Sequence, residues 1–183
     1  ESSGSGFAID ATTANISNAG ILRSANNDAV HSWTSAVIVN SGTINGGATA
    51  NGISFDGQAS ITNSGLIAAK IGILNSGSGA LNLTNLAGGS VVGTITGIFS
   101  QGAATIVNAG SISGGPAAIS TNATLSVSNS GSIIGKVGVQ TSGAANITNG
   151  GTITGTGGTA IKLSSAADTL TLLSGSKING VVD

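Results

Sequence analysis

Residues 38–44 have the sequence IVNSGTI, in which an asparagine and a glycine lie between two aliphatic residues. The same frame, aliphatic-x-Asn-x-Gly-x-aliphatic, recurs about every 20 to 24 residues. Its other copies are ISNAGIL (16–22), ITNSGLI (61–67), IVNAGSI (106–112), VSNSGSI (127–133) and ITNGGTI (147–153), and degenerate copies are LTNLAGGSV (83–91) and LLSGSKI (172–178). A repeat of this length without a helical pattern is typical of a solenoid, in which each copy forms one rung.

Aliphatic residues alternate with other residues around the asparagine, which predicts a strand with one buried face. The aliphatic residues two positions before the asparagine are Ile16, Ile38, Ile61, Leu83, Ile106, Val127 and Ile147. A second strand is expected around Leu22, Ile44, Ile67, Val91, Ile112, Ile133, Ile153 and Ile178. A third is expected around Ile9, Val30, Ile53, Ile73, Ile98, Ile119, Val139 and Ile161. Clusters of Gly, Ser, Asn and Thr separate these stretches, as in turns.

We therefore predict an all-β chain that forms a single domain over residues 1–183. The expected fold is a right-handed single-stranded parallel β-helix, a solenoid of about eight rungs of roughly 22 residues with three short strands per rung. The right-handed sense is expected because parallel crossover connections overwhelmingly adopt it. A left-handed hexapeptide helix would need three six-residue sides, and this chain does not keep that spacing.

The asparagines are expected to form a column of their own along the solenoid. Its members are Asn18, Asn40, Asn63, Asn85, Asn108, Asn129 and Asn149. Asparagine tolerates left-handed backbone angles, and its side chain can bond to turn amides and to the amide one rung away. The glycine two residues later is expected to leave the turn at low steric cost. We predict a structural role, because neutral amides without acidic partners are poor calcium ligands.

The composition excludes several classes of function. Charged residues make up 6% of the 183 residues and the net charge is −1, so no basic patch for nucleic acid or anionic membranes is expected. There is no cysteine for a disulfide or a thiolate metal site. No apolar run has the length of a membrane span. The chain starts at Glu1 rather than Met, so we expect a fragment of a longer protein.

Unusual side chains concentrate in the first three rungs, at Asp10, Asp28, His31, Trp33 and Asp56. Asp10 and His31 both follow the third-strand aliphatic residue, so they are expected to stack one rung apart. Paired carboxylates can act as acid and base on a glycosidic bond, which makes a glycan-active cleft one hypothesis, with Trp33 of a widened loop as a sugar platform. The other interpretation is a solvated loop with an incidental ion pair. We expect the second, and predict no catalytic, cofactor or metal site.

Hydroxyl side chains flank the second-strand aliphatic residue in several rungs. They are Thr43, Ser111, Ser113, Ser132, Thr152 and Thr154. A flat threonine array on a β-helix is the arrangement expected for binding ice, but Leu66, Ala68 and Ile134 interrupt this one.

Four stretches resemble the passenger regions of bacterial autotransporters and related filamentous-haemagglutinin-like surface proteins. They are SITNSGLIAA (60–69), TIVNAGSISGG (105–115), NITNGGTITGTGGTAIKL (146–163) and ADTLTLLSGSKINGVVD (167–183). The resemblance implies export by the type V route, display at the cell surface or release, and roles in adhesion or self-association. It also implies a parent chain with an outer-membrane translocator, of which this sequence would be a passenger piece. No catalytic residue of the family maps onto this sequence.

The expected function is that of a non-enzymatic extracellular rod: an adhesin, a stalk or a biofilm-type scaffold. Its expected partners are further copies of itself or a glycan or protein of a host or cell surface. Two alternatives stay open. One is a fibre subunit that polymerises end to end through open β-helix ends, and the other is the glycan-active enzyme.

Overall fold

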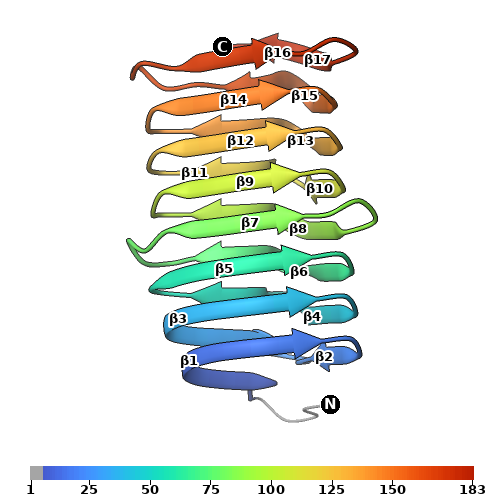
Figure 1. Cartoon of the computed structure of the whole chain (residues 1–183), viewed down its shortest axis with the longest axis vertical. Helices are drawn as coiled ribbons and strands as arrows, with labels where there is room; N and C mark the ends of the chain where they lie inside the picture. The colour runs from blue at the N-terminus through green and yellow to red at the C-terminus, as the bar shows by residue number, and fades with distance from the viewer. Residues whose placement is uncertain (1–5) are drawn as a thin grey trace.

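The chain winds into a right-handed parallel β-helix, which confirms the predicted fold class. The computed structural model describes residues 6–183, and no residue of that range is helical. In Figure 1 the near strands run from left to right and the chain returns behind them while the rungs rise toward the C-terminus, which is the right-handed sense. The seventeen strands within residues 6–183 form one hydrogen-bonded sheet, and their pairings are parallel.

Eight strands, one from each rung, form the near side of the molecule in Figure 1. They are β1 (Ile9–Asn18), β3 (Val30–Asn40), β5 (Gln58–Asn63), β7 (Leu81–Asn85), β9 (Ala104–Asn108), β12 (Leu125–Asn129), β14 (Ala145–Asn149) and β16 (Thr169–Leu172). Seven of them end at the repeated asparagine, and we call this layer the asparagine sheet. From Thr13 onward its pairings contain no register shift.

The second and third predicted stretches form the other sides of the rod. Their strands are β2 (Ile21–Arg23), β4 (Thr43–Phe55), β6 (Leu66–Asn75), β8 (Ser90–Ser100), β10 (Ser111–Gly114), β11 (Ala117–Thr121), β13 (Ser132–Thr141), β15 (Thr152–Lys162) and β17 (Lys177–Val182). In most rungs the two stretches are one continuous strand, with a register shift at the corner between them, as between Gly47 and Asn51. In the rung of β10 and β11 they are separate strands, and the third-stretch residues Ile9 and Val30 form the beginnings of β1 and β3.

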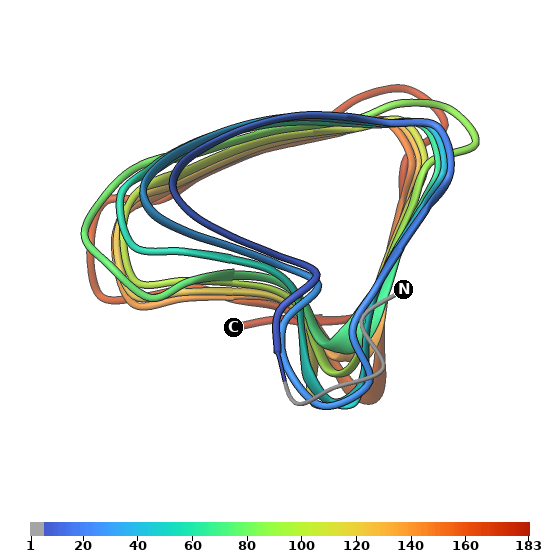
Figure 2. The ribbon, with the colours of Figure 1, turned by 90° about the horizontal axis from the view of Figure 1, so that it is seen from below.

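Seen along its axis, the rod has a three-sided outline with a narrow lobe at one corner (Figure 2). The long upper side of that outline is the asparagine sheet, and it is nearly straight. The long upper side superimposes closely from rung to rung, whereas the corner loops and the lower left side of the outline differ between rungs. The asparagine sheet is therefore the most constant side of the repeat in this view.

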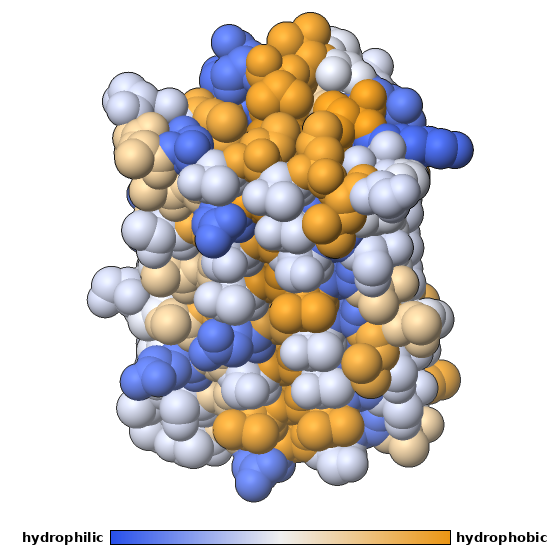
Figure 3. Space-filling view, turned by 45° about the horizontal axis from the view of Figure 1, so that its top comes forward, coloured by the Kyte–Doolittle hydropathy of each residue, from blue (hydrophilic) through white to orange (hydrophobic). Residues whose placement is uncertain are grey.

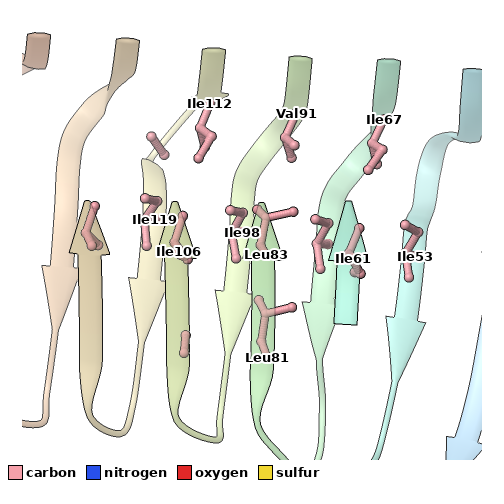
Figure 4. Packing of buried hydrophobic residues seen from close by; sticks show 14 of the residues in the cluster. Ile53, Ile61, Ile67, Leu81, Leu83, Val91, Ile98, Ile106, Ile112 and Ile119 are labelled. Atoms are coloured by element: carbon pink, nitrogen blue, oxygen red, sulfur yellow. The ribbon is translucent and has the colours of Figure 1, made fainter. Parts of the chain in front are cut away.

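The core consists of stacked aliphatic columns inside this outline (Figure 4). One column contains four fully buried residues that follow one another in register: Ile44, Ile67, Val91 and Ile112. Columns of the same kind come from the first and third stretches, for example through Ile106 and Ile98. Each buried aliphatic side chain stabilises the fold by about 1.5–3 kcal/mol relative to an exposed one. The predicted columns are thus the packing that holds the rungs together.

The last rung presents apolar side chains to solvent at the C-terminal end of the rod (Figure 3). Leu172, Leu173, Val181 and Val182 are between 42% and 60% exposed there. Leu170 and Ile178 occupy the core columns but are only partly buried, since they have a neighbouring rung on one side. Within residues 6–183, no helix has the length and apolarity needed to cross a membrane.

Candidate functional site

The asparagine column forms a continuous hydrogen-bonded ladder. Each amide donates from Nδ2 to Oδ1 of the asparagine one rung further on, and the six bonds measure 2.7–2.8 Å. The same Nδ2 also lies within 3.0–3.3 Å of a glycine carbonyl oxygen in its own rung. Nδ2 also donates to a backbone carbonyl oxygen in the next rung, that of the first residue of the second-stretch strand. Asn40, for example, donates to the carbonyl oxygen of Leu66. The ladder therefore locks the corner that follows each strand.

The asparagines have extended rather than left-handed backbone angles. No residue other than glycine within residues 6–183 has a positive φ, and each asparagine is the last residue of an extended strand. Asparagine is needed at this place because it is buried and because its amide both donates and accepts along the rod axis. The expected ladder between the side chains is confirmed, and the tolerance of asparagine for left-handed angles is not used here.

The glycine two residues after the asparagine is required by close contact between rungs rather than by a positive φ. A Cβ atom on Gly65 would lie 2.1 Å from the carbonyl oxygen of Gly42, and one on Gly131 would lie 2.1 Å from that of Gly110. Gly20 belongs to the first copy of the frame, and a Cβ there would meet nothing within 4 Å. The glycines thus allow one backbone turn to sit directly on another.

A second buried polar column lies at the corner after the third stretch, and the sequence analysis missed it. Its members follow the third-stretch aliphatic residue by two positions: Ser32, Asn75, Ser100, Thr121 and Thr141, with Phe55 among them. Asn75 donates to Ser100 Oγ at 3.0 Å, and Thr121 donates to Thr141 Oγ1 at 3.0 Å. Its residue type changes from rung to rung, so only the fixed offset from the aliphatic residue signals it.

At the N-terminal end the structure brings together Asp10, His31 and Trp33. Asp10 and His31 are paired in register, as expected, and His31 Nδ1 lies 3.1 Å from Asp10 Oδ1. Trp33 donates from Nε1 to the same oxygen at 3.0 Å. The imidazole also packs edge to face on the Trp33 ring, with centroids 4.3 Å apart, and stacks against Phe7 at 5.2 Å. One carboxylate oxygen therefore orders two aromatic side chains.

Trp33 lies within β3 rather than in a widened loop, which corrects the sequence interpretation. Its side chain is 55% exposed, so one part of the indole faces solvent while the N–H is bonded. An exposed aromatic ring held in one orientation can contact a sugar face or an apolar side chain.

The other two carboxylates of the predicted cluster have separate partners. Asp28 accepts hydrogen bonds from Asn51 N, at 2.7 Å, and from Ser54 Oγ. Asp56 accepts one from Ser76 Oγ at 2.6 Å. Within residues 6–183, no three His, Cys, Asp or Glu side chains are gathered as metal ligands would be. These contacts fix corners of the first rungs, and none of them pairs two carboxylates across a cleft.

Comparison with known proteins adds no relative, since no family, no curated protein and no solved structure matches this chain.

Proposed function

We propose that the chain is a non-enzymatic, extracellular rod of a bacterial autotransporter-like surface protein, and that it mediates adhesion or self-association. The observation that carries the proposal is the continuity of the repeat. The asparagine ladder runs from Asn18 to Asn149 with the aliphatic columns inside it, so successive rungs are joined into a stiff rod. Eight rungs at about 4.8 Å give a length of roughly 40 Å.

The mechanism we propose is geometric. A rigid solenoid holds a distal surface away from the cell, and its long sides offer many weak contacts that add up when several rods face one partner. The partner class is a second rod or a glycan or protein of another cell surface. Exposed polar side chains, together with Trp33 at the N-terminal end, supply contacts suited to such partners.

The proposal is tested by comparing cells that display the full-length surface protein with cells from which it is deleted. The measurements are cell aggregation and binding to host cells or glycan arrays. We expect deletion to lower at least one of these. Cells that display the protein with Ile106→Asp should behave like the deletion, because this substitution buries a charge in the core column and unfolds the rod. The matched Val107→Asp variant, on the exposed side of the same strand, should retain the folded rod. Unchanged aggregation and binding on deletion would contradict the proposal.

A further inference from the structure

Trp33 is the single tryptophan of the chain, and its side chain is 55% exposed although it lies inside β3. Strands of the neighbouring rungs pair with β3 on both sides, β1 toward the N-terminus and β4 and β5 toward the C-terminus. The ring is therefore not exposed because β3 ends the rod. Tryptophan is one of the residues enriched at binding hot spots, where it supplies a large apolar surface with a polar tip.

A β-bulge lies at Trp33 itself. The pairing of β1 with β3 shifts register between Ala11 and Thr13, where Trp33 and Thr34 stand opposite Thr12 alone. The other printed pairings between strands of the asparagine sheet keep their register throughout. An extra residue in one strand re-aims the side chains beside it, and bulges are common next to active sites for that reason. The one irregular pairing of this sheet thus sets the direction of its exposed aromatic ring.

Two contacts hold the indole in one orientation. Its Nε1 donates to Asp10 Oδ1 at 3.0 Å, and the buried His31 imidazole packs at a right angle to it with ring centroids 4.3 Å apart. His31 is fixed in turn, because its Nδ1 lies 3.1 Å from the same Asp10 oxygen and its ring stacks on Phe7. A ring that is already ordered loses little conformational freedom when a ligand stacks on it, which favours binding.

Carboxylates border the exposed ring. The Asp10 side chain is 43% exposed, and its Oδ2 accepts no hydrogen bond from residues 6–183, so this oxygen can accept one from a ligand hydroxyl. Asp56 holds the position equivalent to Trp33 in the next rung, so a second carboxylate lies at the same corner. Two acidic groups beside the ring disfavour an anionic ligand, such as a uronic acid or a phosphate.

We propose that Trp33 and Asp10 bind a neutral hexopyranose of a cell-surface glycan. One face of a pyranose ring carries C–H groups that stack on a flat indole, and its hydroxyl groups donate to a carboxylate, which is a strong acceptor. A single aromatic wall suits a flat sugar, whereas a cationic ligand is best held by a cage of several rings. One such site is weak, and many displayed rods raise the avidity. The inference rests on the proposed adhesive function and specifies its partner.

The test titrates the purified chain with oligosaccharides and follows the emission of its single tryptophan, which lies in the proposed site. Hexasaccharides of glucose, galactose and mannose are the neutral probes. A hexasaccharide of galacturonic acid is the acidic probe, and a trilysine peptide is the cationic probe. We expect at least one neutral probe to change the emission in a saturable way, and both charged probes to bind at least tenfold more weakly.

Three variants locate the site, with binding measured by calorimetry. Trp33→Ala should lose the binding, and Asp10→Ala should weaken it at least fivefold. Val39→Ala removes a similarly exposed apolar side chain from the same strand and should bind like the unsubstituted chain. The three side chains lie outside the aliphatic core, so circular dichroism should show the same folded rod for each variant.

Three outcomes would overturn the inference. The first is no saturable binding of any neutral probe. The second is unchanged binding in Trp33→Ala or in Asp10→Ala. The third is tighter binding of trilysine than of the neutral probes, which would assign the site to a cationic peptide. Each of them leaves the adhesive function standing if deletion of the full-length protein still lowers cell aggregation or surface binding, so the two failures are distinguishable.

Discussion

Asn63 donates its side-chain amide to Asn85 Oδ1 at 2.8 Å, and the other bonds of the ladder point in the same direction. Each internal amide thus accepts from the rung before and donates to the rung after. Aligned hydrogen bonds of this kind polarise one another, so a break at one member affects its neighbours on both sides. The ladder therefore couples the rungs in addition to the aliphatic core.

Replacing one member of the ladder should destabilise the rod. Asn85→Ala removes the acceptor of Asn63 and the donor to Asn108, and leaves buried polar groups without partners. We expect a loss of about 1–3 kcal/mol in the free energy of unfolding. Asn82→Ala in the same strand is the matched control, because the Asn82 side chain is exposed and its loss should change little. Chemical denaturation midpoints measure the difference, and equal midpoints for the two variants would contradict a structural ladder.

A charge placed in the aliphatic column should be far more damaging than the loss of an amide. Ile106 is fully buried between Leu83 and Val127 of the adjoining rungs. Ile106→Asp places an unpaired carboxylate there, and we expect a loss above about 4 kcal/mol or failure to fold. Val107→Asp, on the solvent side of the same strand, should stay folded. Circular dichroism and denaturation of both variants check this, and similar stabilities would mean that the inward side of β9 is misassigned.

The sequence was sufficient for the rungs because one physical constraint repeats in every copy. A single rung cannot bury Ile44 or Ile67, so the aliphatic positions must recur in register. Aligning successive copies of the repeat is enough to find that register. The same argument predicted that Asp10 and His31 would stack. It could not predict that Trp33 would reach back to Asp10, because the direction of an exposed side chain does not follow from the repeat.

Two other features depend on contacts between rungs. The glycine after the asparagine was expected to leave the turn at low steric cost, and the structure shows where a side chain would clash: a Cβ on Gly65 would lie 2.1 Å from the carbonyl oxygen of Gly42 in the rung before. That distance depends on how closely the corners stack, which the sequence of one rung does not contain. The column through Ser100 and Thr121 was missed because several residue types can fill a buried polar position.

The bond between Trp33 and Asp10 gives a spectroscopic test of the N-terminal cluster. Trp33 is the single tryptophan of the chain, so its fluorescence reports on this place alone. Asp10→Ala removes the acceptor of the indole N–H, and we expect a shifted emission maximum with a stability loss below about 1 kcal/mol, since the carboxylate is partly exposed. Asp168→Ala, in the last rung, should leave the emission unchanged. The same spectrum for both variants would contradict the Asp10–Trp33 bond.

The glycine column provides the sharpest comparison, because the same substitution has opposite surroundings at two equivalent positions. A Cβ on Gly65 would lie 2.1 Å from a backbone oxygen that cannot move without separating two rungs, whereas a Cβ on Gly20 meets open space. We expect Gly65→Ala to lower the free energy of unfolding by more than about 2 kcal/mol. Gly20→Ala should be neutral or slightly stabilising, because alanine restricts the unfolded chain more than glycine does. Thermal and chemical denaturation of the two variants decide the matter. If Gly65→Ala were as stable as Gly20→Ala, the rungs could not be stacked as closely as described, and the ladder distances would be too short as well.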